Sequence, residues 1–320
     1  MNLYDVLVDS AKRARVRELT RIHPWWNIKI VFLFALWAGA GALAVTTEST
    51  AVRVLGWVLA GAALQSLTIF MHEGVHGLLF ENRFLNRWVG VLTGAPALVS
   101  LTAYRVIHIT HHRNTGGPED PDRLANSVPN PTLRRIFFYV WFAVGGILYV
   151  LVHVPVTSLR LAKRKERIDL AVEYGLILGL GAAVVAGLAS IGRLDILLHA
   201  WLWPMLVAGF FTNLRGVTEH MMTEERDEFT SSRTVTSNRL VSFFMNNLNY
   251  HLEHHLVTRI PWYGLRKFHA LLQDDCARAG SPVCRSYVRY LLEAVRLGGS
   301  GVARSDGVAR SRVAEGGAAG

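Results

Sequence analysis

Residues 54–76 read VLGWVLAGAALQSLTIFMHEGVH, an apolar run that leads directly into a histidine cluster. The part from residue 54 to residue 71 is about as long as the ~18 to 20 residues that a helix needs to cross a bilayer. A spanning helix that ends in ionisable side chains brings them to a membrane surface. We therefore expect this stretch to deliver His72 and His76 to the boundary between membrane and water.

The composition is typical of a membrane protein, because 51% of the 320 residues are hydrophobic and only 18% are charged, against about 25% charged in soluble domains. The net charge of +10 does not indicate a nucleic-acid partner, since Lys and Arg flank the apolar runs and form no stripe interleaved with aromatic residues. Such flanks are expected at the cytosolic ends of spanning helices. Cys276 and Cys284 match no common zinc spacing and are expected to be ordinary cytosolic thiols.

The apolar runs predict an all-α integral membrane domain over residues 28–297. It follows a basic, cytosolic N-terminal segment (residues 1–27) that has no early apolar core, so no cleavable signal peptide is expected. A tail rich in Gly, Ala, Ser and Arg, residues 298–320, is expected to be disordered. Four runs are predicted to cross the membrane, namely residues 28–45, 54–71, 170–190 and 194–214.

Two further apolar segments are predicted to be embedded without a full crossing. Residues 88–104 are interrupted by Gly94 and Pro96, which favours a re-entrant or interfacial path. Residues 136–157 are long enough to cross, but a fifth span would separate the histidine clusters onto opposite faces. Placing the basic loop 160–167 in the cytosol makes residues 136–157 a hairpin or an in-plane helix, helped by the flexible pair Gly145 and Gly146.

Three histidine clusters carry the chemistry. They read HEGVH at residues 72–76, HITHH at 108–112 and HLEHH at 251–255. Residues three and four apart share one face of a helix, so each cluster can converge on a metal, and neutral imidazole is a good ligand for iron, copper, zinc and nickel. Eight histidines exceed one tetrahedral site, and His220, just beyond the last span, is a candidate ninth ligand. The pattern predicts two metals in a histidine-rich cytosolic cap.

Other histidines and other functions are less consistent with this pattern. His23 is expected at the interface, and His153, His199 and His269 are not expected to bind metal. HEGVH alone matches the zinc metalloprotease motif, but an intramembrane protease would leave both HxxHH clusters without a purpose. A metal transporter would place its histidines near the middle of the spans, whereas these clusters lie at span ends and in loops.

The three boxes, in this order around these spans, resemble the membrane fatty acid desaturase superfamily, which also contains alkane, sterol and carotenoid hydroxylases and ketolases. The similarity covers roughly residues 25–272 and includes Asn86-Arg87, Asp120-Pro121-Asp122, Thr218-Glu219-His220 and Pro261-Trp262-Tyr263. The boxes are highly specific for the superfamily and much less specific for the substrate.

The resemblance implies a non-haem di-iron centre that uses dioxygen. The implied ligands are His72, His76, His108, His111, His112, His251, His254 and His255, with His220 as the ninth. Some acyl-CoA desaturases carry an asparagine four residues before the equivalent of His220. Here that position is Gly216, and Asn213 is only a weak substitute.

The resemblance further implies desaturation of a fatty acyl or lipid chain, with lipid, alkane or carotenoid hydroxylation or ketolation as the alternative. Electrons would come from a separate carrier such as a ferredoxin with its reductase, because the sequence has no His-Pro-Gly-Gly haem motif. Arg105, Arg113 and the 160–167 loop could steer that carrier or hold a phosphate headgroup. The expected location is the bacterial cytoplasmic membrane, with the active site on the cytosolic face.

Carboxylates near the boxes are expected to tune an all-histidine site, because a metal-bound imidazole often donates its other N–H to a carboxylate. The candidates are Glu73, Asp120, Asp122, Glu219 and Glu253.

Overall fold

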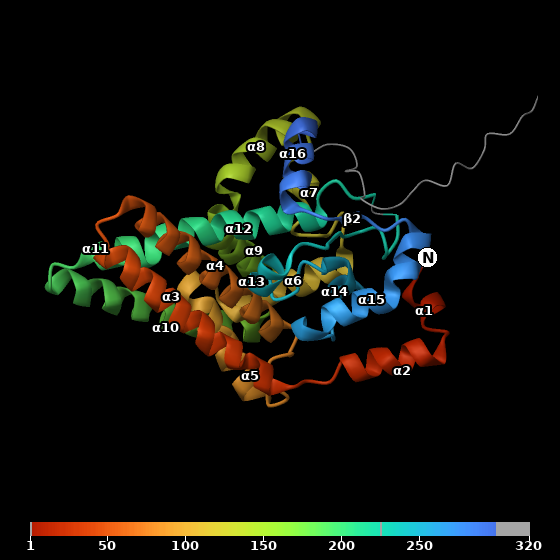
Figure 1. Cartoon of the computed structure of the whole chain (residues 1–320), viewed down its shortest axis with the longest axis horizontal. Coiled ribbons are helices and arrows are strands. Elements are labelled where there is room, and N and C mark those ends of the chain that lie inside the picture. Colours follow the sequence, from red (N-terminus) through yellow and green to blue (C-terminus); the bar gives the residue numbers. More distant parts are fainter. Residues whose placement is uncertain (1, 225, 299–320) are drawn as a thin grey trace, which may run out of the picture.

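The computed structural model describes residues 2–224 and 226–298, apart from the side chains of residues 142 and 143. Most of these residues are helical, and only two short strands occur among them. The tail that we predicted to be disordered, residues 298–320, lies outside the described residues except for residue 298. Figure 1 shows a bundle of long helices at one end of the molecule and a group of shorter helices at the other.

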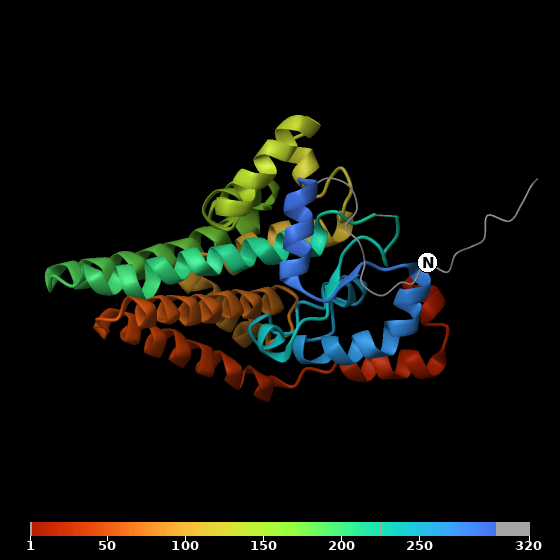
Figure 2. The ribbon, with the colours of Figure 1, turned by 45° about the horizontal axis from the view of Figure 1, so that its top comes forward.

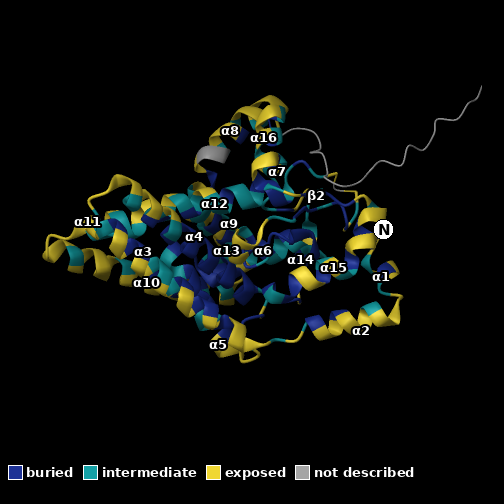
Figure 3. Cartoon of the chain, in the orientation of Figure 1, coloured by how far each residue is buried: buried dark blue, intermediate teal, exposed yellow. Residues whose placement is uncertain are grey.

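All four predicted crossings coincide with helices of spanning length. These are α3 (Ile28–Thr46), α4 (Thr50–Val75), α10 (Arg164–Ser190) and the continuous run formed by α11 (Leu194–Leu197), the π-helical turn η4 (Leu198–Leu202) and α12 (Trp203–His220). In Figure 2, the turn between α3 and α4 and the turn between α10 and α11 both lie at the end of the bundle far from α14 and α15. The outer faces of α3 and α10 carry many exposed apolar side chains, as lipid contact requires (Figure 3).

The segment predicted to be re-entrant is sharply bent. It consists of α5 (Arg83–Gly94), the 3-10 turn η2 (Ala95–Ala97) and α6 (Leu101–Asn114). The two halves meet at 97°, so they form either a broken span or a re-entrant loop. Pro96 lies within η2 at this bend, where a proline disfavours a continuous helix.

A buried carboxylate holds this bend in place. Glu173 of α10 is fully buried and accepts hydrogen bonds from the Ser100 hydroxyl at 2.7 Å and from the Thr102 amide and hydroxyl, both at 2.8 Å. Arg87 of α5 donates to the same carboxylate at 3.0 Å. Because Ser100 is the N-cap of α6, Glu173 fixes the start of the helix that carries the second histidine cluster.

The segment predicted as a hairpin or an in-plane helix is helical without a break. It consists of α8 (Pro131–Leu148), the π-helical turn η3 (Tyr149–His153) and α9 (Val154–Leu161). The hairpin prediction is therefore wrong. Within the described residues five helices are long and apolar enough to cross a membrane, and the fifth is residues Val144–Leu161. That four spans cross, with this helix in plane, stays a prediction.

Gly146 packs against another helix, whereas we predicted that it makes the chain flexible. A Cβ atom built at Gly146 would lie 1.9 Å from the carbonyl oxygen of Gly209 in α12, so two glycine backbones are in direct contact there. Glycine at a close helix crossing lets two backbones approach. The pair therefore fixes α8 against the helix that ends at His220.

Replacing Gly146 by alanine is expected to destabilise the protein by about 1–3 kcal/mol, because the added methyl group overpacks the crossing. A Cβ atom built at Gly175, in the middle of α10, meets nothing within 4 Å, so Gly175→Ala should stabilise the protein by up to about 1 kcal/mol, as loss of a glycine inside a helix does. Thermal unfolding of both variants in one detergent measures the difference. Equal stability of Gly146→Ala and the wild type would contradict this contact.

Shorter elements form the other end of the molecule. They are α1 (Leu3–Val6), α2 (Ser10–Leu19), η1 (Pro24–Asn27), α7 (Leu124–Ser127), α13 (Arg239–Phe244), α14 (His251–Leu256), α15 (Trp262–Ala279) and α16 (Tyr287–Leu297). Strand β1 (Thr234–Val235) pairs in parallel with β2 (Val283–Cys284).

The N-terminal segment packs onto this end of the molecule. Val6, Val16 and Leu19 belong to the same buried cluster as Leu265 and Phe268 of α15. Lys12 forms an ion pair with Asp275 at 2.6 Å, so α2 is tied to α15 by both apolar and charged contacts.

Candidate metal centre

The nine histidines come from four helix ends that meet beside the bundle. His72 and His76 close α4, the second box lies on the last two turns of α6, His220 is the last residue of α12, and the third box is the short helix α14. Helix periodicity puts residues three and four apart on one face. The structure therefore gathers all nine histidines predicted as ligands into two groups.

The first group contains five histidines from all three boxes. Their facing nitrogen atoms all lie within 4.8 Å of one another, in the set His72, His76, His108, His112 and His254. The Nε2 atom of His108 lies 3.0 Å from that of His76 and 2.9 Å from that of His112. Two nitrogens bound at a right angle to an ion at ~2.1 Å lie about 3.0 Å apart, so these separations suit a shared metal ion.

Hydrogen bonding among neutral imidazoles cannot account for this first group. The contacts run in a chain, since His112 also lies 3.1 Å from His254 through the two Nε2 atoms. Each contact needs one donor and one acceptor, and a neutral Nε2 atom is either one or the other and carries at most one proton. Three linked contacts then need one proton to serve two bonds. A metal ion in the centre satisfies all four lone pairs.

The second group lies against the first. His111, His220 and His255 form one set of converging nitrogens, and Glu219, His220 and His251 form an overlapping set. The Nε2 atom of His251 lies 2.9 Å from that of His220 and 3.1 Å from that of His255. Four histidines and one carboxylate could hold a second metal ion here.

Buried nitrogen atoms without hydrogen-bond partners are a second, separate observation in favour of metal binding. Among the described residues, Nε2 of His72 and Nε2 of His111 have no hydrogen-bond partner, although both side chains are almost fully buried. Unpaired polar atoms in a protein interior are costly. In addition, burial, followed by repulsion from neighbouring histidines, lowers the pKa of His251, His254 and His255 well below its ordinary value. These rings are neutral, which is the form that binds metals.

Two of the five predicted carboxylates contact a histidine of the second group. Oδ1 of Asp120 lies 2.9 Å from Nδ1 of His111. Because a carboxylate only accepts, His111 must donate from Nδ1, which leaves the lone pair of its Nε2 atom for a metal. Oε2 of Glu219 lies 3.4 Å from Nδ1 of His251.

The other three carboxylates have different neighbours. Glu73 accepts the backbone N–H of Trp262 at 2.9 Å, and its other oxygen is 3.9 Å from His72, too far for a hydrogen bond. Glu253 bonds His269 and Thr234, each at 2.6 Å. Asp122 accepts from the Tyr149 hydroxyl at 3.2 Å. Their predicted influence on the metal ligands stays a prediction.

The remaining histidines lie outside both groups among the described residues. His199 stacks on Trp57, and His23 faces Tyr263. Burial acts to lower the pKa of His269, but the hydrogen bond to Glu253 outweighs burial and holds this pKa above its ordinary value. His153 is nearer the centre than expected, with its Nε2 atom 3.3 Å from Asp122.

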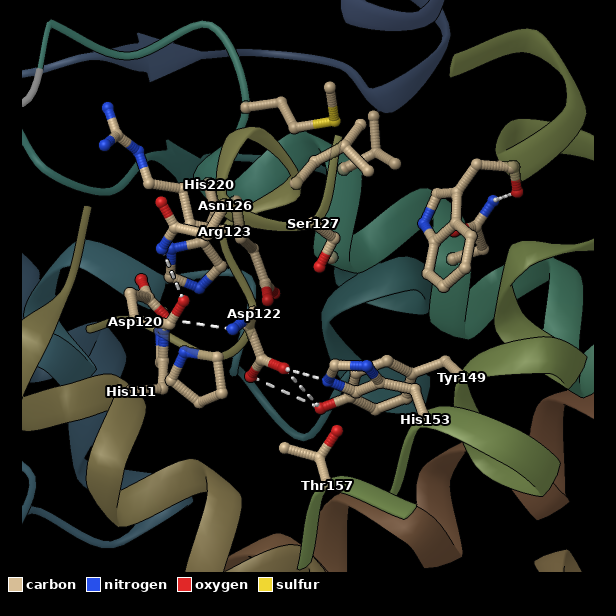
Figure 4. A pocket seen from close by; sticks show the side chains of 18 of the residues that line it. His111, Asp120, Asp122, Arg123, Asn126, Ser127, Tyr149, His153, Thr157 and His220 are labelled. Carbon is tan, nitrogen blue, oxygen red and sulfur yellow. Dashed lines mark hydrogen bonds and ion pairs between the residues drawn. The ribbon is translucent and has the colours of Figure 1, made fainter. Parts of the chain in front are cut away.

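A pocket of about 1120 Å³ adjoins the histidines. The loop that carries Asp120 and Asp122 forms one wall, the helix with Tyr149 and His153 a second, and α12 a third. Figure 4 shows Asp122 turned toward Tyr149 and His153, with His111 and His220 on the opposite side of the loop. The pocket therefore offers a mixed polar and apolar chamber next to the second group.

Three residues of the pocket, Tyr149, His153 and Arg215, were not among the predicted site residues. Tyr149 and His153 are one turn apart in an apolar helix, a position where ionisable residues are functional by default, and that signal could have found them. Arg215 also lines the pocket. Asn213 does so as well, but its side-chain amide donates to the carbonyl of Trp141 at 2.9 Å.

The cysteines are separate from the metal groups. Among the described residues neither cysteine forms a disulfide, and both are buried. Burial raises the pKa of Cys276 to about 12, so this thiol stays protonated.

Comparisons with known proteins point to one family. The family model for fatty acid desaturases matches residues 48–287. Dihydrorhizobitoxine desaturase of Bradyrhizobium elkanii is 31% identical over 284 residues, which cover 81% of this chain and 79% of the relative. The sn-1 oleoyl-lipid 12-desaturase of Arthrospira platensis is 24% identical over 74% and 72% of the two chains. An sn-1 acyl-lipid omega-3 desaturase (ferredoxin) of a Nostoc species is 24% identical over 66% and 64%.

Proposed function

Because this chain belongs to the fatty acid desaturase family, and is therefore an oxidoreductase of the desaturase type, we propose that it introduces a double bond into a fatty acyl or lipid chain. The observation that carries the proposal is the pair of adjoining histidine groups, since the family is known to use two irons. If HEGVH were the site of a zinc protease, the second histidine group would have no role. The glutamate of HEGVH is held by the backbone of Trp262.

We assign the first iron to His72, His76, His108, His112 and His254, and the second to His111, His220, His251 and His255. An iron pair held by these residues would supply the strong oxidant that hydrogen removal from an unactivated methylene requires. The histidines would hold that pair, and neighbouring carboxylates would orient the histidines. Asp120 fixes the ring of His111 through Nδ1, and Glu219 lies against Nδ1 of His251.

The pocket beside the second group suits substrate binding. Its apolar walls include Leu148, Val150 and Val154, which can pack against a hydrocarbon chain and keep water from the reacting carbon. Its polar side, with Asp122, Tyr149 and His153, can bind a polar substituent. A chain bound along this pocket would pass next to His111 and His220.

We further infer a bacterial cytoplasmic membrane location with the metal centre on the cytosolic face. The apolar helices and the desaturase relatives support a membrane protein. The basic loop 160–167 and the basic N-terminal segment lie at the histidine end of the bundle, which is the distribution expected for a cytosolic face. A ferredoxin is the proposed electron donor, by analogy with the relative whose name includes one.

Purified protein loaded with iron is expected to contain about two irons per chain, one for each histidine group. Lipid and small-molecule extracts from a host with and without the gene should then differ by a product that has lost two hydrogens. One tightly held zinc and no iron would contradict the metal assignment. A product that has gained one oxygen would instead assign hydroxylation to the same centre.

A further inference from the structure

Arg215 is a buried positive charge without a full partner. It lies on α12, one turn before Glu219, and its side chain is only 11% exposed. Among the described residues, its Nε and Nη1 atoms are buried without a hydrogen-bond acceptor. A guanidinium stays protonated in proteins, so it cannot escape the cost of burial by losing its proton. A buried charge of this kind requires an anion.

Glu219 supplies only part of that anion. Its Oε2 atom forms an ion pair with Nε of Arg215 at 3.8 Å, a distance too long for a hydrogen bond, and the same oxygen lies 3.4 Å from His251. The Tyr104 hydroxyl bonds the guanidinium but is a neutral partner. Asp122, across the pocket, is turned toward Tyr149 and His153 (Figure 4).

Metal binding increases the need for an anion. Nine neutral imidazoles would add no negative charge to two bound irons, and Glu219, the one carboxylate among the converging groups, would be shared between the second iron and Arg215. Only Asp120 and Glu219, among the five predicted carboxylates, contact a histidine ligand. The pocket that Arg215 lines is the space from which an anionic group can reach the guanidinium.

We propose, on the basis of the desaturase function proposed above, that Arg215 binds an oxyanion of the substrate. The planar guanidinium pairs with a carboxylate or a phosphate through two parallel hydrogen bonds. Because Arg215 is separated from the histidine His251 only by Glu219, the oxyanion lies close to the metals. The carbon attacked is then a few bonds from the oxyanion, which favours a free acid whose carboxylate belongs to the reacting chain.

The test uses the iron-loaded, full-length protein in detergent and measures the binding of octanoate, methyl octanoate and octyl phosphate by calorimetry. Octanoate should bind at least about tenfold more tightly than its methyl ester, because a charge-assisted hydrogen bond is worth about 1.5–3 kcal/mol. Octyl phosphate binding more tightly than octanoate would assign the oxyanion to a phosphate. Equal binding of the acid and the ester by the wild type would overturn the proposal.

Variants locate the preference at Arg215. In Arg215→Gln the preference for the acid should disappear, and in Arg215→Lys it should fall, because lysine offers a single point charge. Arg239→Gln removes an exposed charge that does not line the pocket and should leave the preference unchanged. An unchanged preference in Arg215→Gln, or an equal loss in Arg239→Gln, would overturn the assignment.

Iron content measured in each variant separates binding from metal retention. Loss of iron from both Arg215 variants would assign the residue to holding Glu219 and His251, and would overturn the substrate role. Product profiling stays independent of these measurements. A protein that prefers acids and forms no double bond would contradict the desaturase function alone, whereas a desaturase without acid preference would contradict the role of Arg215 alone.

Discussion

Replacing His254 by alanine is expected to lower desaturation by at least about 100-fold and to reduce the iron content below two per chain. His254 is the last member of the chain of Nε2 contacts in the first group, and its Nε2 atom lies 3.1 Å from that of His112. Loss of a mere hydrogen-bond partner of a metal-bound histidine already costs about 10–100-fold in metal affinity or activity, so loss of the ligand itself should cost at least as much. Product formation and iron analysis on the same preparation measure both effects.

His111→Ala is the matching change in the second group, and it should reduce activity to a similar degree. His23→Ala serves as the control, because His23 is exposed and lies outside both histidine groups. It should keep about two irons and the activity of the wild type. Full activity in either His111→Ala or His254→Ala would show that the ligand assignment is wrong.

Replacing Glu173 by alanine is expected to destabilise the protein by about 3 kcal/mol or more, because the buried donors of Ser100 and Thr102 would lose their acceptor and each buried donor left unsatisfied costs about 1–3 kcal/mol. Arg87, whose side chain is 33% exposed, would keep its ion pair with Asp169. Since α6 carries three histidines, iron content should fall as well. Thermal unfolding and iron analysis in one detergent provide the measurement.

Asp169→Asn is the matched control for Glu173. Asp169 also bonds Arg87, at 2.9 Å, but its side chain is 27% exposed, and a pair of this kind contributes at most about 1 kcal/mol. A loss of stability in Asp169→Asn as large as that in Glu173→Ala would contradict the role given to the buried carboxylate.

The helices of spanning length and the convergence of the histidines could be predicted from the sequence because they depend on local patterns. A run of apolar residues determines a spanning helix whatever it packs against, and HxxHH spacing determines which side chains share a face. His220 followed from the requirement that all ligands lie at one end of the bundle. The structure places its nitrogen 2.9 Å from that of His251.

The features that sequence reasoning missed depend on contacts between distant segments. Gly146 suggested flexibility, but its role is decided by Gly209, which is far away in the sequence. Glu173 was not singled out in the sequence, because its partners come from two earlier helices. Glu253 lies inside the third box, yet it bonds His269 and Thr234. No local pattern specifies such partners.

The sharing of α6 and α14 between the two histidine groups has a consequence for how the enzyme matures. Helix α6 gives His108 and His112 to the first group and His111 to the second, while α14 gives His254 to the first and both His251 and His255 to the second. Neither group is complete until α14 has been synthesised and has docked. We therefore expect iron to be acquired only after the membrane helices have been inserted, and both ions to be gained or lost as a unit.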